Sequence, residues 1–67
     1  MIIRAGDLQE GQRIHIEYGA AGNWMSPTIE KIHQMRNMIL VMFHFGSIQM
    51  DVSFQPDEDV EVLQEDA

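Results

Sequence analysis

The stretch that decides the fold, residues 39–54, reads ILVMFHFGSIQMDVSF. Its centre, Gly46-Ser47, suits a two-residue type II′ hairpin turn, which places Gly at the first central position. That turn predicts a register in which the residues flanking it face each other, as do the residues at every second position beyond them. The resulting pairs are all apolar: Phe45 with Ile48, Phe43 with Met50, Val41 with Val52 and Ile39 with Phe54. Turn chemistry and alternation therefore agree on an antiparallel hairpin whose apolar pairs all face a core.

Shorter strands are expected on both sides of this hairpin. Residues 13–18 alternate strictly between polar and apolar side chains, and residues 19–23 form a loop of small residues. Residues 56–59 make a tight turn before a last short strand, which has Val60 and Val62 on one face. These patterns predict strands joined by short connections.

The segment over residues 27–36 allows two interpretations. A Ser-Pro pair at its start suits a helix cap, and Ile29, Ile32 and Met35 recur at helical spacing. A bent strand with a bulge fits the same residues, and it agrees with the strands expected on both sides. The sequence therefore favours a strand and keeps a short helix over 27–36 as the alternative.

We expect an all-β fold with a single domain over residues 1–63 and a frayed acidic tail at 64–67. The 67 residues leave room for one domain only. Five to six short antiparallel strands close most economically as a small barrel or as two packed sheets, because a flat sheet would leave adhesive edges. We take the barrel as the expected form.

The layout from Ala5 to Leu63 resembles the small SH3-like β-barrels of bacterial and phage proteins. The resemblance lies in the segment AGDLQEGQRI at residues 5–14, in the central hairpin, and in the segments Phe54–Pro56 and Val60–Leu63 around the last turn. It implies a barrel in which a one-turn helix precedes the last strand. These motifs describe a fold and not an activity.

The charge is unevenly distributed along the chain. Four Lys and Arg against eleven Asp and Glu give a formal net charge of −7. Six of the acidic residues lie within residues 57–67, which contain no Lys or Arg, so the rest of the chain is nearly neutral. Binding to a phosphate backbone depends on many cations, so nucleic acid is not an expected partner.

Several functional classes have no support in the sequence. The absence of Cys excludes a disulfide scaffold, a thiol nucleophile and a zinc finger. There is no Gly-rich phosphate loop and no nucleophile elbow, so we expect no enzyme, no catalytic residue and no cofactor. The amino terminus lacks a signal-peptide pattern, and the apolar run at 38–43 is far shorter than the ~20 residues that span a bilayer. We therefore expect a cytoplasmic protein with no membrane partner.

The second face of the strand at 38–45 is unusual. If its odd-numbered residues face the core, three large apolar side chains in a row face outward, which is uncommon on the surface of a small acidic protein. Coverage by the chain's own elements is one explanation, and an interface with a partner protein or a second copy is the other. The predicted interface residues are Met38, Leu40, Met42, His44 and Trp24.

The sequence thus predicts a small non-catalytic interaction module, an adaptor or regulator of a phage or bacterium. One alternative is an acidic nucleic-acid mimic that occupies a basic protein partner, based on the charge of residues 57–67. A second is Cu(I) binding, because imidazole and thioether groups suit this ion and recur two residues apart at His33, Met35, Met42 and His44. Met is also an ordinary filler of small cores, so we assign no metal ligand.

Overall fold

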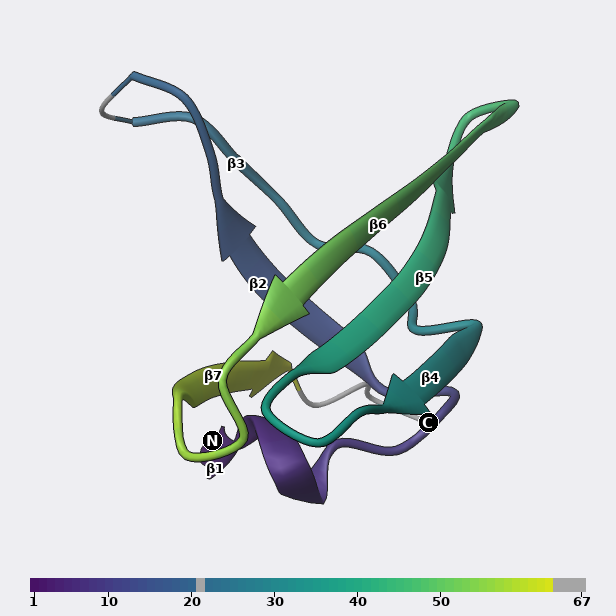
Figure 1. Cartoon of the computed structure of the whole chain (residues 1–67). Coiled ribbons are helices and arrows are strands. Elements are labelled where there is room, and N and C mark those ends of the chain that lie inside the picture. The colour runs from purple at the N-terminus through teal and green to yellow at the C-terminus, as the bar shows by residue number, and fades with distance from the viewer. Residues whose placement is uncertain (21, 64–67) are drawn as a thin grey trace.

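The fold is all-β throughout residues 1–20 and 22–63, the part of the chain that the computed structural model describes (Figure 1). Seven strands in these ranges form two antiparallel sheets, ordered β1-β7-β2-β3 and β4-β5-β6. Their bounds are β1 Ile2–Arg4, β2 Arg13–Glu17, β3 Trp24–Met25, β4 Lys31–Gln34, β5 Ile39–Phe45, β6 Ile48–Phe54 and β7 Asp59–Leu63. The all-β prediction is confirmed, with seven strands in place of five to six. The predicted tail at 64–67 lies outside the described residues.

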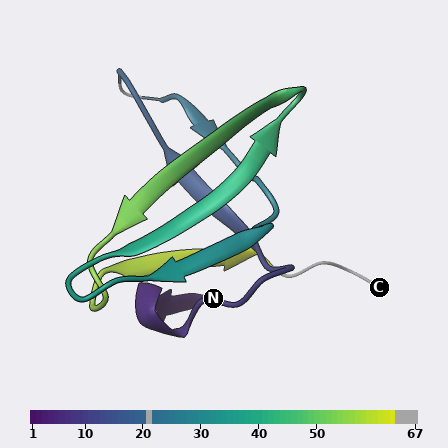
Figure 2. The ribbon, with the colours of Figure 1, turned by 45° about the vertical axis from the view of Figure 1, so that its right-hand side comes forward.

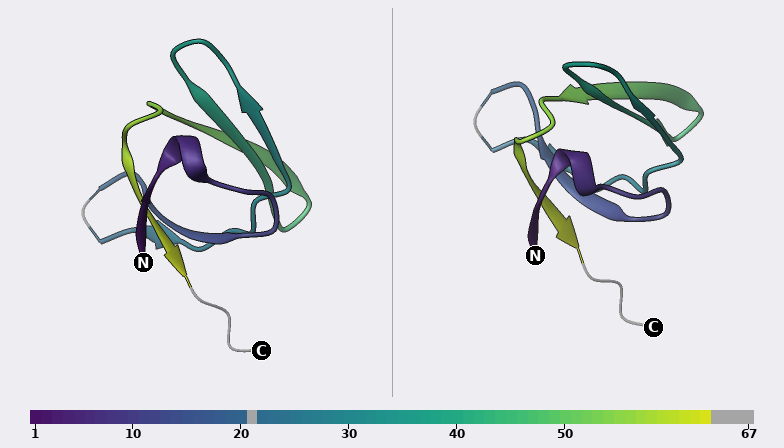
Figure 3. Two further views of the ribbon diagram at one scale, coloured as in Figure 1. Left: turned by 90° about the horizontal axis from the view of Figure 1, so that it is seen from below. Right: turned by 60° about the horizontal axis from the view of Figure 1, so that its bottom comes forward.

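The two sheets pack against each other without closing into a barrel, which corrects the expected form. The buried core takes side chains from both sheets and from the segments between them: Ala5, Leu8, Ile14, Ile29, Ile39, Val41, Phe43, Val60 and Val62. A 3-10 turn, η1 (Ala5–Asp7), lies across one end of the space between the sheets (Figure 3). On the open side, β6 pairs only with β5 in the described part of the chain.

The central hairpin has the register that its sequence predicts. Phe45 pairs with Ile48, and the ladder continues without interruption to Ile39 and Phe54. Gly46 has a φ of +64°, and no described non-Gly residue has a positive φ. A positive φ at the first central position alone is the pattern of a type II′ turn.

The prediction that all of the inward-facing hairpin residues belong to the core is wrong at the turn end. Phe43 is 2% exposed, whereas Phe45 is 55% exposed and Ile48 is 63% exposed. The physical reason is length: β5 and β6 have seven residues each, while β4 has four and β3 has two. The hairpin therefore projects beyond the strands that could cover it, and the β2–β3 hairpin projects beside it as a second, diverging arm (Figures 1 and 2).

The segment at 27–36 forms a strand, not a helix. The strand β4 covers Lys31–Gln34, and the residues before it run along β2. The N–H of Ile29 donates to the carbonyl of Gln12 at 2.8 Å, and the N–H of Gly11 donates to the carbonyl of Ile29 at 2.8 Å. These bonds use the backbone groups that a helix would need within itself. The strand interpretation is confirmed.

Replacing Gly46 by Ala is expected to lower the free energy of unfolding by about 1–2 kcal/mol, because a Cβ disfavours the left-handed region. No atom lies within 4 Å of the position that the Cβ would take, so backbone strain is the main cost. Ser47→Ala at the neighbouring turn position is the control, with an expected change below about 0.5 kcal/mol. Urea unfolding monitored by circular dichroism measures both, and equal losses would contradict the type II′ assignment.

Candidate functional site

The predicted apolar stripe lies on the outer face of the β4–β5–β6 sheet, where Met38, Leu40 and Met42 are half-buried. Because β5 is the central strand, polar residues of both neighbours flank the stripe. Leu40 lies between His33 and Ser53, and Met42 lies between Lys31 and Asp51. The stripe is therefore one residue wide and has a polar border.

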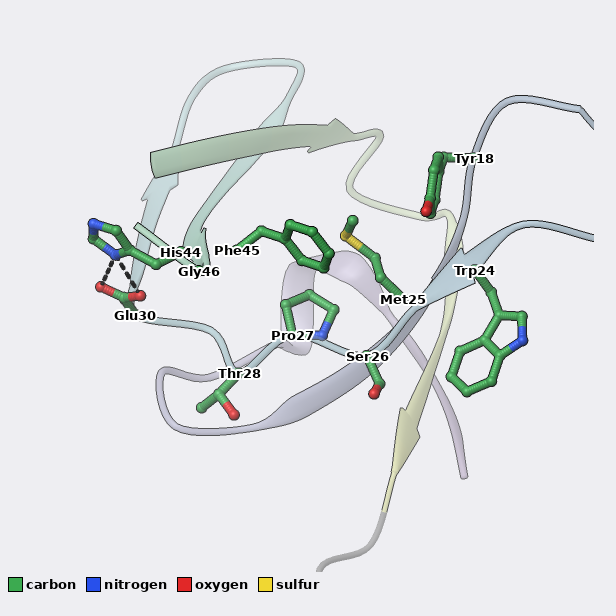
Figure 4. A pocket seen from close by; sticks show the side chains of 10 residues that line it. All are labelled: Tyr18, Trp24, Met25, Ser26, Pro27, Thr28, Glu30, His44, Phe45 and Gly46. Carbon is green, nitrogen blue, oxygen red and sulfur yellow. Dashed lines mark hydrogen bonds and ion pairs between the residues drawn. The ribbon is translucent and has the colours of Figure 1, made fainter. Parts of the chain in front are cut away.

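The other two predicted interface residues lie apart from this stripe. His44 is exposed, and its Nδ1 lies 2.7 Å from Oε2 of Glu30. Trp24 comes from the other hairpin, is 59% exposed, and stacks on His15 with ring centroids 5.3 Å apart. His44 and Trp24 both line a hollow of about 480 Å³ between the two arms, but they lie at its opposite ends (Figure 4). The five predicted residues do not form one continuous surface.

The residues considered for Cu(I) are only partly brought together. His33, Met42 and His44 border one hollow, and Met35 does not line it. His33 pairs with Leu40, and His44 lies four residues beyond Leu40 along β5. At the ordinary rise of a strand, the two histidines are therefore about 13 Å apart along the sheet. Lys31 pairs with Met42 between the two histidines and places a positive charge there. Within the described ranges, no group of three or more His, Cys, Asp or Glu side chains is arranged to hold a metal ion.

A different apolar surface lies on the facing sides of the two arms, and we call it the inter-arm surface. Its residues lie on the inner faces of the two hairpins, the same faces that contribute to the core further from the tips. Most of these residues are exposed, and Met25 is half-buried. They are Tyr18 and Met25 on the β2–β3 arm and Phe45, Ile48 and Met50 on the β5–β6 arm.

Across the hollow, the two arms present complementary apolar groups. The ring of Phe45 points toward Met25 and Pro27 (Figure 4). Polar side chains, including Ser26 and Glu30, border the same hollow. An apolar centre with a polar rim is the usual composition of a protein interface, and Met side chains adapt readily to different partners.

The inter-arm surface escapes sequence reasoning for a specific reason. Alternation identifies the inner faces of Tyr18 and Phe45 correctly, but burial depends on where the opposing strands end. The one available signal is the length difference between the predicted hairpin of residues 39–54 and its short neighbours. Short neighbours cannot cover the tip of a longer hairpin.

Comparisons of the chain with protein-family models, curated proteins and solved structures found no match. No helix in the ranges that the structure describes has the length and apolar character needed to cross a membrane.

Proposed function

We propose that this chain is a small non-catalytic protein-interaction module, an adaptor or regulator of a phage or bacterium, that acts in the cytoplasm. The observation that carries the proposal is the inter-arm surface. Phe45 and Ile48 are more than half exposed, although they lie on the same face of the hairpin as Val41 and Phe43, which are buried. Exposed apolar groups gathered on two facing arms are typical of a docking surface.

The apolar surface that Phe45 and Ile48 still expose can contribute to the free energy of binding. Burying a fully exposed Phe or Ile side chain contributes about 1.5–3 kcal/mol. Phe45 and Ile48, which are 55% and 63% exposed, can gain the corresponding part of it. A few such anchors near the centre of an interface usually supply most of its binding energy. Phe45 and Ile48 face each other across the hairpin, so one partner segment reaches both.

Membership of the SH3-like class is part of the proposal. It is supported by the β4–β5–β6 meander and by a final strand, β7, that pairs with both β1 and β2. The one-turn helix that the resemblance implies before that strand is absent from the described residues, and a turn with a hydrogen bond from the N–H of Glu58 to the carbonyl of Gln55 takes its place. Such folds carry many unrelated functions, so the activity is argued from the surface alone.

Replacing Phe45 by Ser is expected to weaken partner binding by at least about tenfold, as removal of a central aromatic anchor does. The partner is isolated from the native host with the immobilised protein and purified, and its Kd is measured by calorimetry. Met35→Ser is the matched control, because Met35 is also exposed but lies outside the inter-arm surface.

A third variant separates the two apolar surfaces. Met42→Glu places a charge in the outer stripe and is expected to leave the Kd unchanged. If Met42→Glu abolishes binding while Phe45→Ser retains it, the inter-arm surface is not the interface. Loss of binding in Met35→Ser as well would indicate unfolding or a nonspecific contact.

A further inference from the structure

The two sheets leave an opening between the edge of β6 and the strands β2 and β7, and we call this opening the seam. A hollow of about 470 Å³ lies there. Its apolar lining includes Ile16, Val52, Phe54 and Val60, which connect it to the core. Figures 1 and 2 show β6 crossing over β2 with no strand between them.

The edge of β6 offers backbone hydrogen-bonding groups to the seam. In an antiparallel hairpin with a two-residue turn, the residues that flank the turn exchange hydrogen bonds, and every second pair beyond them does the same. Ile48, Met50 and Val52 therefore bond to β5. Gln49 and Ser53, with Asp51 between them, direct their N–H and C=O groups away from β5. The described residues show no backbone bond from these positions to another segment.

The opposite side of the seam also has an unpaired backbone. The pairing of β2 with β7 ends at His15 and Glu61. The N–H of Ile14 donates to the carbonyl of Pro27, and the N–H of Tyr18 donates to the carbonyl of Asn23, both on the β3 side. By alternation, the backbone groups of Glu17 face the seam, beyond the end of β7.

The seam is strongly acidic. Four carboxylates line it, from Glu17, Glu58, Asp59 and Glu61, and its lining contains no Lys or Arg. The amino group of Met1 lies 3.0 Å from Oε2 of Glu61, and Nε2 of His15, which also lines the seam, lies 3.6 Å from Oε1 of Glu17. No Lys or Arg side chain pairs with any of the four carboxylates among the described residues. Glu17, Glu58 and Asp59 are exposed and Glu61 is half-buried, and we call these four carboxylates the rim of the seam.

We propose that the seam binds an extended segment of a partner protein in which apolar and basic residues alternate, and that this segment adds to β6 as a further strand. The inference rests on the proposed interaction function and names its partner. Side chains of an added strand alternate between the two faces. Those facing inward meet the apolar lining and Met50, and those facing outward meet Asp51 and the carboxylates of the rim.

Charge selects this occupant over a second copy of the chain. The strand β6 carries Asp51 and no Lys or Arg, so a second β6 would bring negative charge to an acidic seam. Like charges placed across a strand pair are destabilising. A basic segment removes this repulsion and gains attraction from both sides.

The test uses a capped peptide of four Val-Lys repeats, with a peptide of four lysines followed by four valines as the composition control. We expect saturable binding of the alternating peptide by calorimetry and much weaker binding of the control. Amide hydrogen exchange should slow at Gln49, Asp51 and Ser53, whereas Ile48 and Met50, already bonded to β5, should change little.

Two variants test the backbone and the charges separately. Ser53→Pro removes an N–H at the edge of β6 without removing a hydrogen bond to β5, and edge strands tolerate such a substitution. It should weaken the binding of the alternating peptide by about tenfold. Ser53→Ala keeps the N–H and should bind normally. The double variant Glu17→Gln, Asp59→Asn should weaken binding by about fivefold.

The inference is overturned if the composition-control peptide binds as tightly as the alternating peptide, or if the Ser53→Pro variant binds the alternating peptide normally. It is equally overturned if the slowed hydrogen exchange appears away from β6. It is also overturned if sedimentation shows a dimer that Ser53→Pro dissociates, because β6 would then pair with a second copy. Failure of the proposed function is distinguishable. If a partner loses affinity for Phe45→Ser but is not displaced by the Val-Lys peptide, the interaction module stands and strand addition to β6 is rejected.

Discussion

Phe43→Ala is expected to lower the free energy of unfolding by about 3–5 kcal/mol, the usual cost of truncating a buried Phe. Phe45→Ala should lower it by less than about 1 kcal/mol, as surface substitutions do. The two residues have the same chemistry, the same strand and the same face, and differ in exposure, 2% against 55%. This pair therefore measures where the core ends along β5.

The loss expected for Phe43→Ala is large compared with the total stability of the domain. At about 0.05–0.15 kcal/mol per residue, a domain of this length has only about 3–10 kcal/mol of stability. Phe43→Ala should therefore remove from about a third to all of that stability. Trp24 is largely exposed and a poor reporter, so far-ultraviolet circular dichroism in urea is the better measurement.

A milder variant covers the case in which Phe43→Ala does not fold at all. Phe43→Leu keeps most of the buried volume and should retain a cooperative transition at reduced stability. Equal losses at positions 43 and 45 would show that the arms close over Phe45. In that case the inter-arm surface would be part of the core and unavailable to a partner.

The fold could be predicted from sequence wherever a local rule decides it. Gly46 fixes the turn type, the turn fixes the register, and the register fixes which face each hairpin side chain occupies. The burial of Ile48 could not be predicted in the same way. It depends on the distance to a strand more than twenty residues away in sequence, which no local pattern encodes.

The candidate site was likewise predictable only where local alternation decides it. The outward orientation of Leu40 and Met42 follows from alternation, but their polar neighbours come from the pairing of β4, whose register the sequence leaves open. The seam depends on β2 and β6 together, two strands that do not pair. Glu17 and Asp59 are polar surface residues in sequence, and only the open edge between the sheets makes them neighbours.

Ile29→Ala is the second prediction with a large expected effect, a loss of about 2–5 kcal/mol in the free energy of unfolding. Ile29 is 1% exposed, and both its N–H and its C=O are hydrogen-bonded to the turn that precedes β2. The truncation leaves a cavity at the point where the segment before β4 is anchored to the other sheet. These two backbone hydrogen bonds hold Ile29 in place and limit the collapse that would reduce this cost.

The comparison with Met35→Ala decides between the two interpretations of residues 27–36. A helix with Ile29, Ile32 and Met35 on one stripe would bury all three and make their truncations similar in cost. The strand leaves Ile32 half-buried and Met35 exposed, so the losses should fall in the order Ile29, Ile32, Met35, the last below about 1 kcal/mol. Equal losses at 29 and 35 in urea unfolding would contradict the strand. A graded series would show that Ile29 joins the sheets and that the chain reaches the surface by Met35.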